Sequence, residues 1–176
     1  MNQWLLHKGP AVLRELGIQK DMNLLDFGCR HGTYSIPAAG VVGKKGKVVA
    51  LDKEREALLE LKQRNEFNLE NILCIQGDET ILHFFSSQFF DVVLLFDVIH
   101  LIKDRAEFLK SLQFVLSTKG MLCVYPRHHQ EKMQLNLFEV IQEIEKAGFT
   151  HRVTYEGVIM HDDTLVSDDI IVFSKQ

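Results

Sequence analysis

The sequence is poor in the residues that mark several protein classes. Its 176 residues include three cysteines, three prolines and one tryptophan. The cysteines, at positions 29, 74 and 123, form no C-x-x-C pair. Their number and spacing exclude a disulfide framework and a zinc ribbon. The longest apolar run, residues 92–96, is far shorter than the roughly 20 residues that a membrane helix needs.

No excess of positive charge is present either. The formal net charge is −4, with 25% charged and 46% hydrophobic residues, as is ordinary for a folded globular protein. A mildly acidic surface has no general attraction for phosphate backbones or anionic lipids, so we expect no nucleic-acid and no membrane partner. The first residues lack a basic segment followed by an apolar run, and a cytoplasmic location is therefore expected.

Short apolar runs alternate with amphipathic stretches along the chain. The runs predict strands at 24–27, 47–51, 72–75, 90–96, 121–125, 150–155 and 170–174. Helical spacing is found at 34–42, 55–65, 105–116 and 132–147. The early strands are continuously apolar, as in parallel sheets covered on both faces. We therefore predict a doubly wound, mostly parallel seven-stranded α/β sheet.

The two ends of the chain depart from this alternation. Residues 156–169 are turn-like and too short for a helical crossover, so the last two strands are predicted to form an antiparallel hairpin. The first 20 residues predict one short helix that covers the sheet, with Pro10 in its first turn and Gly17 just past its end. No repeat or linker divides the chain, and a single domain over residues 1–176 is expected.

The most informative segment is a glycine-containing turn after the first predicted strand. In open α/β sheets the ligand lies outside the carboxyl ends of the strands, and this turn is its usual place. A dinucleotide fingerprint that begins at Gly28 would require glycines where Arg30 and Thr33 stand. A P-loop would need a Gly-Lys-Ser/Thr ending, which is absent. The spacing thus disfavours a nicotinamide-dependent reductase.

The same turn fits two of the three glycines of an acidic-x-G-x-G-x-G loop, with Asp26 as the acidic residue. That pattern resembles motif I of the class I S-adenosylmethionine-dependent methyltransferases. Further along, Val48-Val49-Ala50-Leu51-Asp52, Cys74-Ile75-Gln76-Gly77-Asp78, the run from Phe90 to Leu101 and Leu116-Ser117-Thr118-Lys119-Gly120-Met121-Leu122 resemble later motifs of the family, in the same order. The resemblance implies a Rossmann-like methyltransferase fold with S-adenosylmethionine as cofactor.

The resemblance also implies which residues bind the cofactor. In the family, the acid at position 52 binds both ribose hydroxyls and the acid at position 78 reaches the adenine amino group. Each acid also has a simpler explanation as a cap of the turn or helix that follows it. The implied binding residues are Asp26, Gly28, Arg30, Gly32, Asp52, Asp78 and Asp97.

Arg30 replaces the central glycine of the family loop. Three interpretations remain open: its side chain points away from the ligand, it binds the methionine carboxylate of the cofactor, or it fills the site. The third would leave a non-catalytic binding or scaffold protein that retains the fold.

His100 is the candidate catalytic residue. It follows the apolar run that contains Asp97, and a positioned histidine accepts a proton from a hydroxyl or amine near neutral pH. A loop histidine bonded to backbone is the alternative. No metal is expected, because the histidines lack a spacing typical of metal ligands. A metal site would require ligands from His128 and His129 together with ligands from the remote segment His161-Asp162-Asp163.

The predicted reaction is an in-line displacement that carries the cofactor's methyl group to an acceptor. The sequence has no inserted domain and no basic tract, which favours a small-molecule acceptor. So short a domain has few elements to cover its site, and a neighbouring subunit in a homo-oligomer would be one way to complete it.

Overall fold

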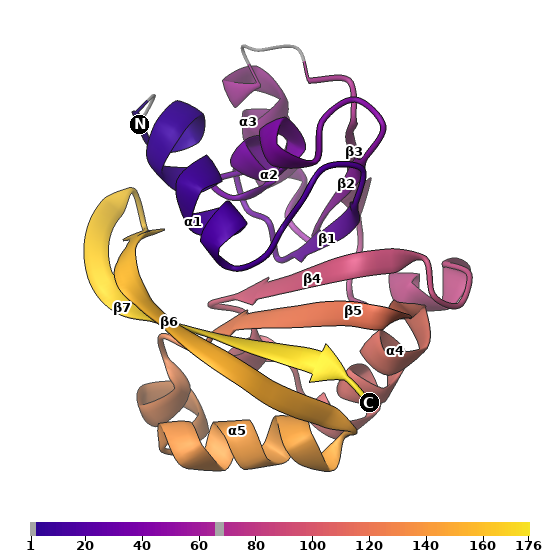
Figure 1. The fold of residues 1–176 in the computed structure, drawn as a ribbon, viewed down its shortest axis with the longest axis vertical. Coiled ribbons are helices and arrows are strands. Elements are labelled where there is room, and N and C mark those ends of the chain that lie inside the picture. The colour runs from indigo at the N-terminus through magenta and orange to yellow at the C-terminus, as the bar shows by residue number, and fades with distance from the viewer. Residues whose placement is uncertain (1–2, 66–68) are drawn as a thin grey trace.

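A computed structural model describes residues 3–65 and 69–176. Its centre is a seven-stranded sheet with the strand order β3-β2-β1-β4-β5-β7-β6 (Figure 1). Strands β1 to β5 run parallel, and β7 is antiparallel to both of its neighbours. The strands are β1 (Asn23–Phe27), β2 (Lys47–Asp52), β3 (Ile72–Gln76), β4 (Phe90–Phe96), β5 (Leu116–Tyr125), β6 (Phe149–His161) and β7 (Thr164–Lys175).

Helices cover both faces of the sheet. They are α1 (Gly9–Glu15), α2 (Ser35–Val42), α3 (Arg55–Arg64), α4 (Arg105–Val115) and α5 (Leu137–Lys146). Because successive side chains of a strand point to opposite faces, Leu24 and Val92 pack with α1 and α2, while Leu25 and Val93 pack with α4 and α5. The result is a three-layer α/β/α fold with one apolar core on each side of the sheet.

The predicted doubly wound sheet is confirmed, and its strands and helices follow one another in the predicted order, although several bounds differ. The N-terminal segment is two elements, a wide helical turn at Trp4–Lys8 followed by α1, where one helix was predicted. These elements pack against α2 and β6. The predicted helix at 132–147 begins later, at Leu137, because Asn136 and Glu139 form a capping box there.

The prediction of a turn-like segment at 156–169 is wrong. Strands β6 and β7 pair through that whole segment, and only Asp162 and Asp163 form the turn. Both adopt left-handed backbone conformations, with φ of 44° and 59°, as a two-residue hairpin turn requires. The strands persist because Ile159 and Met160 are buried against the N-terminal elements, which the local pattern did not reveal.

None of the helices in the described parts of the chain is long and apolar enough to span a membrane.

The start of α2 rests on a close approach at Gly32. Its φ is +83°, and a Cβ at this position would lie 2.6 Å from Cγ of Leu61 in α3. Gly40, by contrast, lies exposed in α2 with nothing within 4 Å of an added Cβ. An added Cβ would therefore clash at Gly32 but would be accommodated at Gly40.

We expect Gly32→Ala to lower the free energy of unfolding by about 1–3 kcal/mol, because of the strained φ and the clash with Leu61. Gly40→Ala, the matched control, should raise it by about 0.5–1 kcal/mol, since it removes chain entropy from the unfolded state at no steric cost. Urea unfolding of both variants checks this. Equal effects of the two substitutions would contradict the packing role of Gly32.

Candidate active site

A cavity of about 670 Å³ opens at the edge where the parallel strands end. Its volume lies within the range of sites that enclose small ligands and cofactors. The walls come from the ends of β1, β2, β4, β5 and β6 and from the loops that follow them. Of the residues predicted from the sequence, seven line it: Asp26, Gly28, Arg30, Asp52, Asp78, Asp97 and His100.

Asp52 ends β2 and holds the neighbouring loops by its carboxylate. One oxygen accepts the backbone N–H of Arg30 at 2.8 Å, and the other accepts that of Glu54 at 2.9 Å. The residue is 7% exposed. Each carboxylate oxygen has two lone pairs, so both retain capacity for a ligand hydroxyl. Turn capping and ribose binding are thus compatible at this residue.

Gly28 is required by the turn that follows β1. Its φ is +76°, and a Cβ would lie 2.8 Å from Cγ2 of Val98. Its N–H donates to the carbonyl of Leu51 at 2.8 Å, which ties the turn to β2. Gly32 is not among the cavity-lining residues, and packing against Leu61 accounts for it. A cofactor contact at Gly32 therefore stays a prediction that the cavity lining does not support.

The side chain of Arg30 does not fill the cavity. The residue has a φ of +46°, the left-handed region that glycine adopts readily, which explains why glycine suits this position. Its guanidinium pairs with the carboxylate of Asp162 at 2.5 Å, and the side chain is 66% exposed. Arg30 thus links the loop after β1 to the β6–β7 turn at the rim of the site.

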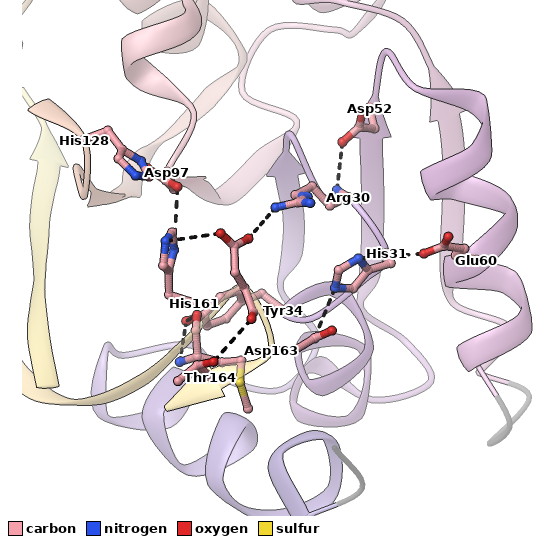
Figure 2. A network of polar contacts seen from close by, with 12 residues as sticks. Arg30, His31, Tyr34, Asp52, Glu60, Asp97, His128, His161, Asp163 and Thr164 are labelled. Atoms are coloured by element: carbon pink, nitrogen blue, oxygen red, sulfur yellow. Dashed lines mark hydrogen bonds and ion pairs between the residues drawn. The ribbon is translucent and has the colours of Figure 1, made fainter. Parts of the chain in front are cut away.

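A second set of contacts holds the same turn (Figure 2). Asp163 lies 3.4 Å from Nε2 of His31 and 3.4 Å from Nη2 of Arg64. The hydroxyl of Tyr34 donates to the carbonyl of Met160 at 2.8 Å and accepts its N–H at 3.2 Å. Polar contacts at the β6–β7 turn and at the end of β6 therefore keep the hairpin over the glycine loop.

Asp26 is buried inside the site, with Oγ of Ser35 donating to it at 2.5 Å. Burial raises the pKa of its carboxyl to about 7, and the nearby charge of Asp52 acts in the same direction. Asp26 therefore changes its charge near neutral pH.

Asp78 follows β3 and caps the short helical segment Glu79–Phe84. One carboxylate oxygen accepts both the hydroxyl and the N–H of Thr80, at 2.6 and 3.0 Å. These two bonds hold the pKa of Asp78 below its usual value. The capping interpretation therefore fits, and the charged group also faces the cavity.

Three histidines surround Asp97 at the opposite end of the cavity. Asp97 directly follows β4 and has a left-handed φ of 56°, an uncommon backbone state that clusters at functional sites. Nδ1 of His128 lies 2.6 Å from one carboxylate oxygen, and Nδ1 of His100 lies 3.6 Å from the same oxygen. Nδ1 of His161 lies 3.6 Å from the other oxygen, as Figure 2 shows together with His128.

The candidate base His100 is 9% exposed at its side chain. Its Nδ1 is buried and has no hydrogen-bond partner within the described residues. Burial lowers the pKa of its imidazole, which favours the neutral form that a base requires. Cys29, also in the cavity wall, is unsuited as a nucleophile because burial raises the pKa of its thiol.

The sequence did not reveal how these histidines meet. The carboxyl ends of β4 and β5 place Asp97 and His128 together, as their positions after two predicted strands indicate. The sequence predicts the C-terminal hairpin but not its length. His161 lies at the end of β6, inside the segment predicted to be turn-like, so its place beside Asp97 could not be predicted.

Comparison with known proteins agrees with this architecture. The family model described as a methyltransferase domain matches residues 18–162, most of the chain. The chain belongs to the S-adenosylmethionine-dependent methyltransferase family. A demethylmenaquinone methyltransferase of Staphylococcus aureus is 30% identical over 111 residues, which are 63% of this chain and 45% of that protein. The chain thus spans about half the length of the curated relatives that it matches.

Solved structures share the fold of this methyltransferase. An S-adenosylmethionine-dependent methyltransferase from Aquifex aeolicus superposes with a TM-score of 0.76 at 21% identity, covering 99% of this chain and 93% of that one. A putative methyltransferase from Listeria monocytogenes gives 0.69 at 18% identity, with 96% and 99% covered. These likenesses establish the fold, and S-adenosylmethionine is the cofactor implied by the family.

The residues present fit that cofactor. The cavity is large enough, and its lining offers a buried carboxylate with unused lone pairs, at Asp52, next to the glycine turn that follows β1. Arg30 leaves the space free because its guanidinium is engaged by Asp162.

We expect Asp26→Asn to stabilise the protein more at pH 8 than at pH 5. The unfolded chain loses the Asp26 proton near pH 4, and the folded protein retains it up to about pH 7. Between these values folding must take up a proton, so this contribution to the stability of the native protein falls as pH rises. Asn has no proton to take up. The increase in the free energy of unfolding that Asp26→Asn produces should therefore be roughly 2–3 kcal/mol larger at pH 8 than at pH 5.

Urea unfolding at the two pH values measures this gain. Asp21→Asn is the matched control, because it removes one exposed carboxylate and Asn tolerates the φ of 68° found there. A gain from Asp26→Asn that is independent of pH would contradict the buried, protonated Asp26.

Proposed function

We propose that this protein transfers the methyl group of S-adenosylmethionine to a small-molecule acceptor. The observation that carries the proposal is that one cavity contains both an acidic end at Asp52 and a histidine-rich end at Asp97. One end suits the nucleoside part of the cofactor, and the other suits an acceptor that must lose a proton.

In this proposal the first three strand ends hold the cofactor. Asp52 accepts hydrogen bonds from the two ribose hydroxyls, and Asp78 accepts one from the adenine amino group at the rim. Gly28 supplies the positive φ of the turn and leaves room for Val98, which keeps the loop backbone at the cavity wall. When bound, the cofactor supplies a methyl group that is activated by its positively charged sulfonium. The protein supplies alignment and the exclusion of water.

The Asp97 end then receives the acceptor. The hairpin turn at Asp162 and Asp163 lies over the glycine loop, and the described lining leaves a cavity of small-molecule size. The Staphylococcus aureus relative is a demethylmenaquinone methyltransferase, and a small-molecule acceptor of that protein supports the same class here.

His100 is the proposed general base. Its ring lines the cavity three residues after Asp97, and its buried Nδ1 faces the Asp97 carboxylate at 3.6 Å. It would take the proton of an acceptor hydroxyl or amine as the methyl group is transferred. Asp97 would act as the positioning residue that orients the surrounding imidazoles.

Calorimetric titration with S-adenosylhomocysteine tests the cofactor assignment. We expect binding to the native protein, no binding of NAD, and a loss of at least tenfold in affinity for Asp52→Ala, because the substitution removes ribose acceptors and the anchor of the Arg30 backbone.

Asp21→Asn is the control for a lost carboxylate and should bind like the native protein. Circular dichroism of Asp52→Ala separates loss of binding from loss of folding. Absence of binding to the native protein at millimolar ligand would contradict the proposal and leave the scaffold alternative.

A further inference from the structure

The geometry around Asp97 points to a binding site for a divalent transition-metal ion, formed by Asp97, His128 and His161. We propose that the ion is of the zinc type and holds the acceptor. The part about the acceptor rests on the proposed function, whereas the ion site stands on the arrangement of the three side chains.

The first support is the convergence of ligand atoms. One carboxylate oxygen of Asp97 and one ring nitrogen each of His128 and His161 all lie within 4.8 Å of one another. In tetrahedral zinc sites with bonds of about 2.0–2.1 Å, neighbouring ligand atoms are about 3.3 Å apart. Small side-chain rotations therefore suffice to place an ion among the three.

The set of donors suits a transition metal. Two imidazoles and one carboxylate are found in zinc and non-haem iron sites, whereas magnesium prefers oxygen ligands alone. Asp97 directly follows β4, His161 ends β6 and pairs with Thr164 of β7, and His128 lies three residues beyond β5 and is bonded to Asp97. A site on such rigid elements keeps its geometry without a bound ion.

Contacts behind the ligands support the same assignment. Nε2 of His161, the nitrogen that points away from Asp97, lies 3.5 Å from the carboxylate of Asp162. Metal-ligating histidines characteristically donate their second N–H to such a group, which fixes the ring and its tautomer. Asp162 is held in turn by Arg30.

His100 provides an independent observation. Its imidazole is nine-tenths buried beside Asp97, and its Nδ1 makes no hydrogen bond in the part of the chain that the structure describes, lying 3.6 Å from the Asp97 carboxylate. A buried polar atom without a partner is costly unless a ligand or ion completes its surroundings. The ring of His128 packs between the other two, with its centroid 5.3 Å from that of His100 and 5.5 Å from that of His161.

The ion would keep an open position toward the cavity, since all three ligands line it. Three protein ligands with a free fourth position are typical of catalytic rather than structural zinc. The acceptor class follows: a small molecule whose hydroxyl or thiol binds the ion. Its O–H or S–H bond breaks, the proton passes to His100, and the methyl group is then transferred to the metal-held oxygen or sulfur while the bond from methyl carbon to sulfonium breaks.

Metal titration of the chelator-treated protein, without a histidine tag, tests the site. We expect one equivalent of Zn²⁺ to bind by calorimetry, Co²⁺ to give the visible absorption of a four- or five-coordinate site, and Mg²⁺ not to bind. His128→Ala and His161→Ala should each weaken Zn²⁺ binding at least tenfold. His83→Ala, which removes an exposed histidine outside the cavity, should leave it unchanged.

Circular dichroism of the histidine variants shows that they remain folded. Asp52→Ala should lose that ligand and keep Zn²⁺, so failure of the cofactor assignment and failure of the metal site are separate results. No binding of Zn²⁺, or binding that survives loss of both His128 and His161, would overturn the proposal.

Discussion

The loop that follows β1 depends on the carboxylate of Asp52. This carboxylate accepts the N–H of Arg30, whose backbone is left-handed. Residues other than glycine are disfavoured in that conformation, so the hydrogen bond helps to hold it. The bond fixes the direction in which the Arg30 side chain leaves the loop. Its guanidinium then meets Asp162, and the β6–β7 turn is held at the rim of the cavity. One buried acid thereby links cofactor loop and hairpin.

The hairpin carries this constraint to the other end of the site. Asp162 follows His161 directly, so holding the turn also positions the imidazole that faces Asp97. The hydroxyl of Tyr34 fixes the preceding residue, Met160, from the opposite side. The two ends of the cavity are therefore coupled through the backbone of β6, and a change at the glycine loop is expected to reach the histidines.

Much of this could be predicted from the sequence, because its signals are local. The continuously apolar strands gave the parallel sheet, and acids directly after them marked the edge at which Asp26, Asp52 and Asp97 gather. The capping role of Asp78 was likewise open to prediction, since it depends on residues two positions away. Strand ends are reliable markers because all parallel strands finish at the same edge.

The remainder depends on contacts between distant segments. The length of β6 and β7 is set by packing of Ile159 and Met160 against elements more than 100 residues earlier, and a local pattern cannot show it. For the same reason His161 was not placed beside Asp97. The direction of the Arg30 side chain could not be predicted from the sequence either, because its partner Asp162 lies 132 residues away.

A crystal structure with S-adenosylhomocysteine bound tests the central claim, that one cavity joins a cofactor end at Asp52 to an acceptor end at Asp97. The account predicts the ribose hydroxyls at the Asp52 carboxylate and the sulfur atom directed toward Asp97 and its histidines. A ligand bound with its ribose away from Asp52, or with its sulfur facing away from the histidines, would contradict it.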